Sequence, residues 1–127
     1  MIYNFIALDE EYTNIIIDFN KIGYLKIIEE TPEYTIFELI YRYKASLKTV
    51  KFQMKLSKND ISKFLMKFKI FRLNNFFINT QTVEFITETK ITNTNSKLNI
   101  HFTNGTYLII NKIETKKWEE WAKVRLK

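Results

Sequence analysis

The sequence predicts an α+β domain, with a mostly antiparallel sheet of about six strands and helices packed on one face of the sheet. Three observations predict this class. Apolar residues make up 46% of the 127 residues, which is enough for a hydrophobic core. Several segments alternate apolar and polar residues, as half-buried strands do, and others carry apolar residues at helical spacing. The expected order of elements is α-βββ-α-βββ-α.

A helix is predicted first, over residues 10–22. The apolar residues that would share one face of this helix are Tyr12, Ile15, Ile16, Phe19 and Ile22. Asp9 is expected to cap the N-terminus of the helix, and Gly23 is expected to follow its C-terminus. The isoleucine run at residues 15–17 leaves a strand as the alternative, because β-branched residues favour strands.

Three strands and a second helix are predicted next. The strands are expected at residues 24–30, 34–43 and 47–56. In the third strand Lys51 and Lys55 alternate with apolar residues, so their side chains are expected on the exposed face. Ser57 and Asp60 form a variant of the capping box, which predicts a helix over residues 58–72, with an end by Lys69 as the alternative. Its buried stripe consists of Ile61, Phe64, Leu65 and Phe68.

A second set of three strands and a helix follows an asparagine-rich link at residues 72–82. The strands are expected at residues 83–92, 97–102 and 106–113. Asn104 and Gly105 predict a type I′ turn between the last two strands. The final helix, over residues 114–127, would place Trp118, Trp121 and Ala122 on one side.

We interpret the chain as a single domain over residues 1–127, with the possibility of two βββα units at residues 24–72 and 81–127 after the first helix. A chain of this length can remove roughly two thirds of its unfolded surface from water, which suffices for one core. No linker rich in glycine or proline divides it, since the chain contains only two glycines and one proline.

Composition argues against most catalytic chemistry. Cysteine is absent and His101 is the only histidine, so a cysteine nucleophile or a histidine-based metal site or triad cannot be built from this chain alone. We therefore expect a protein that is not an enzyme and that binds no cofactor and no metal. Residues 1–8 lack the basic start of a signal peptide, and no apolar run reaches the length of a membrane span. A cytoplasmic location without a membrane partner is expected.

Charge is distributed unevenly along the chain. The net formal charge is +6, but residues 1–38 carry −6 and residues 39–127 carry +12. Residues 41–72 alone hold ten lysines or arginines and one acid, Asp60. Such asymmetry produces a field that steers a charged partner toward one face. Part of the lysine content also fits the codon bias of an AT-rich genome, because Ile, Lys, Asn, Phe and Tyr dominate the composition.

The binding surface is expected within or beside residues 41–72. Basic side chains would provide the charge, and apolar side chains among them would anchor a protein partner. The candidate residues are Lys51, Lys55, Lys63, Met66, Lys67, Ile70, Arg72 and Phe77. Most aromatic residues of the stretch fall on faces expected to be buried, which argues against a stacking platform for nucleic acid.

The leading hypothesis is a small binding protein that acts on another protein, either acidic or part of a nucleoprotein complex. Its size and composition also suit a phage or mobile-element inhibitor of such a complex, which would compete with nucleic acid. The first alternative is a nucleic-acid-binding domain that uses the basic face at residues 41–72. The second is a metal-dependent nuclease, with Glu84, Glu88 and Lys90 on one strand face and Asp60 as a further acid.

Overall fold

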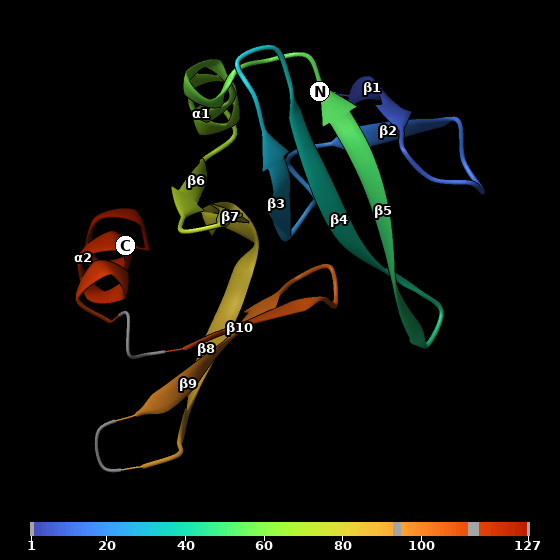
Figure 1. The fold of residues 1–127 in the computed structure, drawn as a ribbon. Helices are drawn as coiled ribbons and strands as arrows, with labels where there is room; N and C mark the ends of the chain where they lie inside the picture. Colours follow the sequence, from blue (N-terminus) through green and yellow to red (C-terminus); the bar gives the residue numbers. More distant parts are fainter. Residues whose placement is uncertain (1, 93–94, 112–114, 127) are drawn as a thin grey trace.

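The computed structural model describes residues 2–92, 95–111 and 115–126, which form two antiparallel sheets and two helices (Figure 1). The larger sheet has the order β2-β1-β5-β4-β3-β7-β6, and the smaller has the order β10-β9-β8. The larger sheet contains β1 (Ile2–Ala7), β2 (Asn14–Asp18), β3 (Tyr24–Glu30), β4 (Thr35–Tyr43), β5 (Ser46–Met54), β6 (Ile70–Leu73) and β7 (Phe76–Asn79). The smaller contains β8 (Val83–Lys90), β9 (Ser96–Phe102) and β10 (Tyr107–Asn111). The helices are α1 (Lys58–Met66) and α2 (Thr115–Arg125), and a short 3₁₀ turn spans Thr80–Thr82.

The predicted fold class is wrong in its helices. Strands make up 55% of the structure and helices 17%, and the described residues contain two helices where the prediction had three. The two helices also do not form a layer on one sheet face. Figure 1 shows α1 beside the larger sheet and α2 beside the smaller one, and each contributes to a different hydrophobic core.

The predicted first helix is instead a strand between two turns. Ile15 is half-buried, Ile16 is 68% exposed and Ile17 is buried, which is the alternation of a strand. β2 pairs along its length with β1, a strand that the prediction missed. So short an apolar run fits both helical spacing and strand alternation. A strand forms here because the side chains are β-branched and because β1 is available as a partner strand.

The second helix begins where predicted but ends earlier. Ser57 caps α1, since its hydroxyl accepts a hydrogen bond from the backbone N–H of Asp60 at 3.4 Å. After Met66 the chain turns through Lys69, whose φ of 61° lies in the left-handed region and stops the helix. The chain then continues as β6, so the last residues predicted as helical belong to the sheet.

The predicted asparagine-rich link contains a β-hairpin. Asn74 and Asn75 form a two-residue turn between β6 and β7, and Asn74 has a φ of 54°. Asparagine tolerates this left-handed conformation better than most residues, so it suits a tight turn. The turn joins two strands that the sequence analysis did not predict, β6 and β7.

The other strands match the prediction in type. β3, β4 and β5 form an antiparallel meander, and β8, β9 and β10 form another, followed by α2. Lys112 and Ile113, which the prediction placed in the last strand, lie outside the described residues. The interpretation as one domain with two βββα units stays a prediction.

The turn between β9 and β10 differs from the predicted type I′ geometry. Only Gly105 has a positive φ there, at 84°, whereas a type I′ turn needs positive φ at two residues. The N–H of Gly105 donates to the carbonyl of Phe102, and the N–H of Phe102 donates to the carbonyl of Thr106. This is a three-residue loop that ends in a bulge at the glycine.

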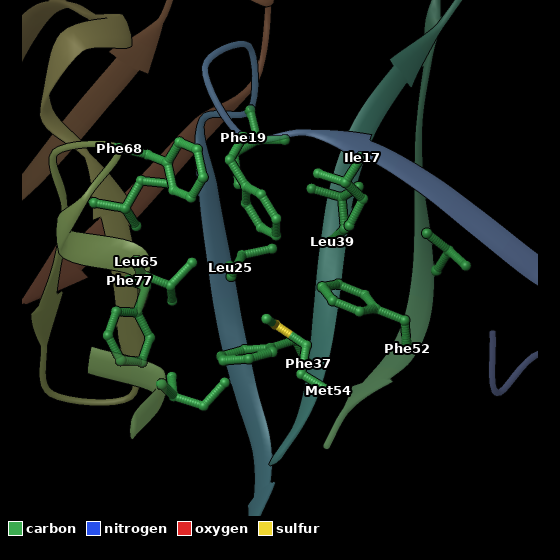
Figure 2. Close-up of a cluster of buried hydrophobic side chains, with 14 of the residues drawn as sticks. Ile17, Phe19, Leu25, Phe37, Leu39, Phe52, Met54, Leu65, Phe68 and Phe77 are labelled. Atoms are coloured by element: carbon green, nitrogen blue, oxygen red, sulfur yellow. The ribbon is translucent and has the colours of Figure 1, made fainter. Parts of the chain in front are cut away.

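One core lies between the larger sheet and α1 (Figure 2). Phe19, Phe37 and Phe52 are fully buried there, and Phe19 packs against Phe68 of the segment after α1 with ring centroids 5.2 Å apart. The β1–β2 hairpin runs across the meander, because β1 pairs with β5 at only two positions. Its inner side chains thereby close the core from the side opposite the meander.

A second core joins the two sheets. Tyr24 and Ile78 of the larger sheet pack in one cluster with Ile100 and Phe102 of the smaller sheet and with Trp118 of α2. β6 and β7 therefore have buried side chains on both faces. This explains their apolar sequence, which resembles neither an exposed loop nor an amphipathic strand.

Candidate binding groove

The fold distributes the basic stretch over several surfaces. Lys51 lies opposite Glu38 in the β4–β5 pair, and the Nε of Arg42 donates to the carbonyl of Gly105 at 2.9 Å. Lys48 lies over the ring of Tyr43, with its Nζ 4.9 Å from the ring centroid. The ten basic residues of this stretch therefore do not form one continuous face.

Part of the stretch lines a groove between the two helices, which we call the interhelix groove. Its volume is about 1270 Å³. The basic residues around it come from α1, β6 and α2, and they are Lys58, Lys63, Arg72 and Arg125. The remaining lining residues are Asn59, Ser62, Leu73, Asn74, Asn75, Glu120, Trp121 and Val124. Four cations and one carboxylate thus line it, and the positive N-terminal end of α1 lies at its edge.

Arg72 is held in the groove wall by an ion pair and a hydrogen bond. Its guanidinium donates to both carboxylate oxygens of Glu30, at 2.7 and 3.1 Å, and its Nε donates to the carbonyl of Asn74 at 2.9 Å. The side chains of Arg72 and Glu30 are 30% and 21% exposed. These hydrogen bonds lower the pKa of the Glu30 carboxyl below its ordinary value. Arg72 is therefore fixed, and its charge is partly neutralised.

The pair predicts a pH dependence of stability. Because the pKa of Glu30 is lowered in the folded state, its contribution is present above the unfolded pKa of about 4.3 and is lost as the pH falls through the folded pKa. Arg72→Leu should therefore lower the free energy of unfolding by roughly 1–2 kcal/mol at pH 7. Near pH 3, where Glu30 of the variant is neutral, the difference should be much smaller.

Urea unfolding of both proteins at the two pH values measures this difference. Glu30→Gln is the matched control, because it keeps the shape of the side chain and removes the charge. A loss that is the same at both pH values would show that packing of the Arg72 stem, and not its charge, stabilises the fold.

The α2 side of the groove combines charge with exposed apolar surface. The guanidinium of Arg125 lies 5.0 Å from the ring centroid of Phe71 and 5.8 Å from that of Trp121. Trp121 is itself buried, and its indole N–H donates to the carbonyl of Arg72 at 2.8 Å. Val124 is 66% exposed beside these charges. An exposed aliphatic side chain in a groove whose charged lining is mainly basic resembles the centre and rim of a protein interface.

The eight predicted site residues are separated by the fold. Lys63 and Arg72 line the interhelix groove. Met66 is 53% exposed, and the lysines outside the groove, which are also exposed, are Lys51, Lys55 and Lys67. Ile70 and Phe77 are 0% and 1% exposed, because they lie in β6 and β7 within the first core. Of the three apolar candidates, Met66 alone is at the surface.

Sequence reasoning did not find Arg125 and Val124 as partners of the basic stretch. Both lie near the end of α2, where Val124 is exposed and Arg125 lies over the ring of Trp121, and their proximity to α1 arises only from the packing of α2 on the second core. The available signal was weak: Val124 interrupts a polar helical face next to Lys123 and Arg125.

The residues considered for the nuclease alternative have structural contacts. Glu88 accepts a hydrogen bond from the hydroxyl of Ser96 at 3.0 Å, and Asp60 accepts one from the hydroxyl of Ser57 in the first turn of α1. Within the described residues, no group of three or more His, Cys, Asp or Glu side chains could hold a metal ion. The alternative gains no support from this geometry.

Neither a membrane span nor a known relative points to a function. In the part of the chain that the structure describes, no helix has the length and apolar character needed to cross a membrane. Comparison with protein-family models, with curated proteins and with solved structures found no match. The surface of the molecule itself is therefore the basis for a functional proposal.

Proposed function

We propose that this chain is a non-enzymatic binding protein that holds an acidic segment of another protein in the interhelix groove. The observation that carries the proposal is that Lys58 and Lys63, from the middle of the sequence, line one groove together with Arg125 and the exposed Val124 from near its C-terminus. Arg72 is engaged by Glu30, so it contributes mainly by fixing the groove wall. The other three cations supply the charge.

The combination of groups favours a protein over a nucleic acid in this groove. The aromatic side chain in its lining, Trp121, is 6% exposed, so it offers no ring face to a base. Val124 provides an apolar contact, which a phosphate backbone does not use. Charge would steer the partner, and the apolar contact would slow its release.

Affinity purification with the immobilised protein tests this function. The double variant Lys63→Glu and Arg125→Glu should lower recovery of the captured protein at least about tenfold, because two attractions become repulsions. Lys55→Glu with Lys67→Glu is the matched control. It changes the net charge equally at exposed positions outside the groove and should retain the partner.

Salt and nuclease treatment separate the two kinds of partner. A partner held by Val124 and the cations should survive nuclease treatment, and its recovery should fall when Val124 is replaced by serine. A complex with nucleic acid should lose orders of magnitude in affinity between about 50 and 200 mM salt and disappear after nuclease treatment. Equal capture by the wild type and the groove variant would contradict the proposal.

A further inference from the structure

The outer face of the smaller sheet carries a row of aromatic rings, which we call the aromatic row. The strand register places Phe85 of β8 opposite His101 of β9, and His101 opposite Tyr107 of β10. Phe85 is 48% exposed, Tyr107 is 43% exposed and His101 is half-buried. The strand register that brings these rings together is set by pairing between strands, so the predicted strands alone do not reveal the row.

The rings contact one another instead of the core. Phe85 and His101 are stacked, with centroids 4.2 Å apart and an interplanar angle of 15°. Tyr107 lies 6.3 Å from His101 at 36°. The Nε2 of His101 is also 3.5 Å from the hydroxyl of Thr87, which helps to fix the imidazole ring. The second core is filled from the opposite face of these strands, so packing does not account for aromatic residues here.

Polar and basic groups surround the row. The next two cross-strand rows on the same face are Thr87, Asn99 and Ile109, and then Thr89, Lys97 and Asn111. None of the nine residues in these three rows is acidic. Along the strands in the opposite direction from Lys97, the rings are followed by the β9–β10 loop. There Arg42 donates a hydrogen bond to the carbonyl of Gly105. Cations thus lie on both sides of the rings.

We propose that the aromatic row binds single-stranded nucleic acid. Bases stack on aromatic rings without regard to sequence, and each stacked base contributes substantially to affinity. Phe85 and His101 cover one face of each other's rings, so bases are expected to stack on the outward face of Phe85, which is 48% exposed, and on Tyr107, which is 43% exposed. Lys97 and Arg42 can contact phosphates, and Asn99 can hydrogen-bond to base edges.

This site is separate from the interhelix groove and does not depend on the proposed function. The groove is lined by α1, β6 and α2, whereas the aromatic row belongs to β8, β9 and β10. The two sites would suit a protein that acts on a nucleoprotein complex, with the protein component in the groove and exposed nucleic acid on the sheet.

Fluorescence anisotropy with labelled oligonucleotides tests the proposal. The probes are oligo(dT) and oligo(U), each about 12 nucleotides long, and a DNA duplex of the same length. In about 0.15 M salt, the single strands should bind at least about tenfold more tightly than the duplex, whose bases are stacked internally. A preference between the DNA and RNA strands would show whether the site contacts the 2′-hydroxyl.

Variants of the rings locate the binding. Phe85→Leu and Tyr107→Leu keep apolar bulk on an exposed face, so the fold should persist, but each should weaken binding roughly 5- to 100-fold. Tyr43→Leu is the matched control, because Tyr43 is 52% exposed, lies beside Lys44 and Lys48, and points to the face of β4 opposite to that of Arg42.

Three outcomes would overturn the proposal. The first is no binding of either single strand at micromolar protein. The second is equal affinity for single strands and duplex. The third is that neither ring variant changes the affinity for single strands. This includes the case in which only the groove variant, Lys63→Glu with Arg125→Glu, weakens binding. That last result would place nucleic acid in the interhelix groove and would count against the proposed function as well.

Discussion

Asn79→Leu should lower the free energy of unfolding by about 3 kcal/mol, because it removes the hydrogen bonds of a fully buried side chain. Asn79 is 0% exposed. Its side-chain amide donates to the carbonyls of Phe19 and Ile22, at 3.1 and 2.9 Å, and its carbonyl oxygen accepts from the N–H of Gln81 at 3.1 Å. One side chain thus ties the turn after β2 to the end of β7.

The cost comes mainly from the groups left behind. In the leucine variant the carbonyl of Phe19 loses its bond to the Asn79 amide, and Phe19 is 0% exposed, so this carbonyl has little access to water. Ile22 is less affected, since its carbonyl also accepts from the hydroxyl of Thr82 at 2.9 Å. The side chain of leucine also has a larger volume than that of asparagine, so it would crowd the neighbouring buried residues.

Chemical unfolding of the wild type and two variants measures the effect. Thr82→Val is the matched control, because it removes one hydroxyl that donates to Ile22 while Asn79 still donates to the same carbonyl. Its cost should be about 1 kcal/mol. If Asn79→Leu cost no more than Thr82→Val, the hydrogen bonds of Asn79 would not be what holds this turn.

The turn pinned by Asn79 also explains why the first helix was predicted wrongly. Phe19 and Ile22 are buried in the structure, where a strand ends and a turn follows. The same two residues would also be buried on the inner face of a helix, so their positions do not distinguish the two arrangements. The choice depends on Asn79, which lies far away in the sequence and satisfies the carbonyls of the turn. Local periodicity contains no information about such a partner.

Other elements could be predicted because their signals are local. The capping residue Ser57 and the alternation in β5 are properties of neighbouring residues, and both were confirmed. The end of α1 could not be predicted, because Lys69 adopts a positive φ without being glycine or asparagine. β6 and β7 were missed since their burial on both faces removes the alternation that marks a strand.

The candidate sites show the same division. Lys63 and Arg72 were found from the charge of their own segment. The groove additionally needs Arg125, which packing brings close, and the aromatic row needs the correct register of three strands. A shift of one residue moves every side chain of a strand to the other face, so a predicted strand without its register does not define a surface.

Gly23→Ala should be the most damaging of the small substitutions, with a loss of about 3 kcal/mol in the free energy of unfolding. A Cβ at this position would lie 2.8 Å from Cγ of Phe102 and 2.8 Å from Oγ1 of Thr106. Both neighbours are buried, at 3% and 1% exposure, so neither can move into solvent. Sequence analysis had assigned Gly23 to the end of a helix, whereas its actual role is close contact between the two sheets.

Gly105→Ala provides the matched comparison for this argument. Its Cβ would lie 2.9 Å from Nε of Arg42, which is the flexible end of an exposed side chain and can move away. Gly105 has a φ of 84°, so alanine there should cost about 1 kcal/mol through backbone strain. Thermal unfolding of both variants measures the two losses in stability. If Gly23→Ala lost less stability than Gly105→Ala, the two sheets would be able to move apart at this point. The contact between Gly23 and Phe102 would then not hold β9 rigidly against the larger sheet.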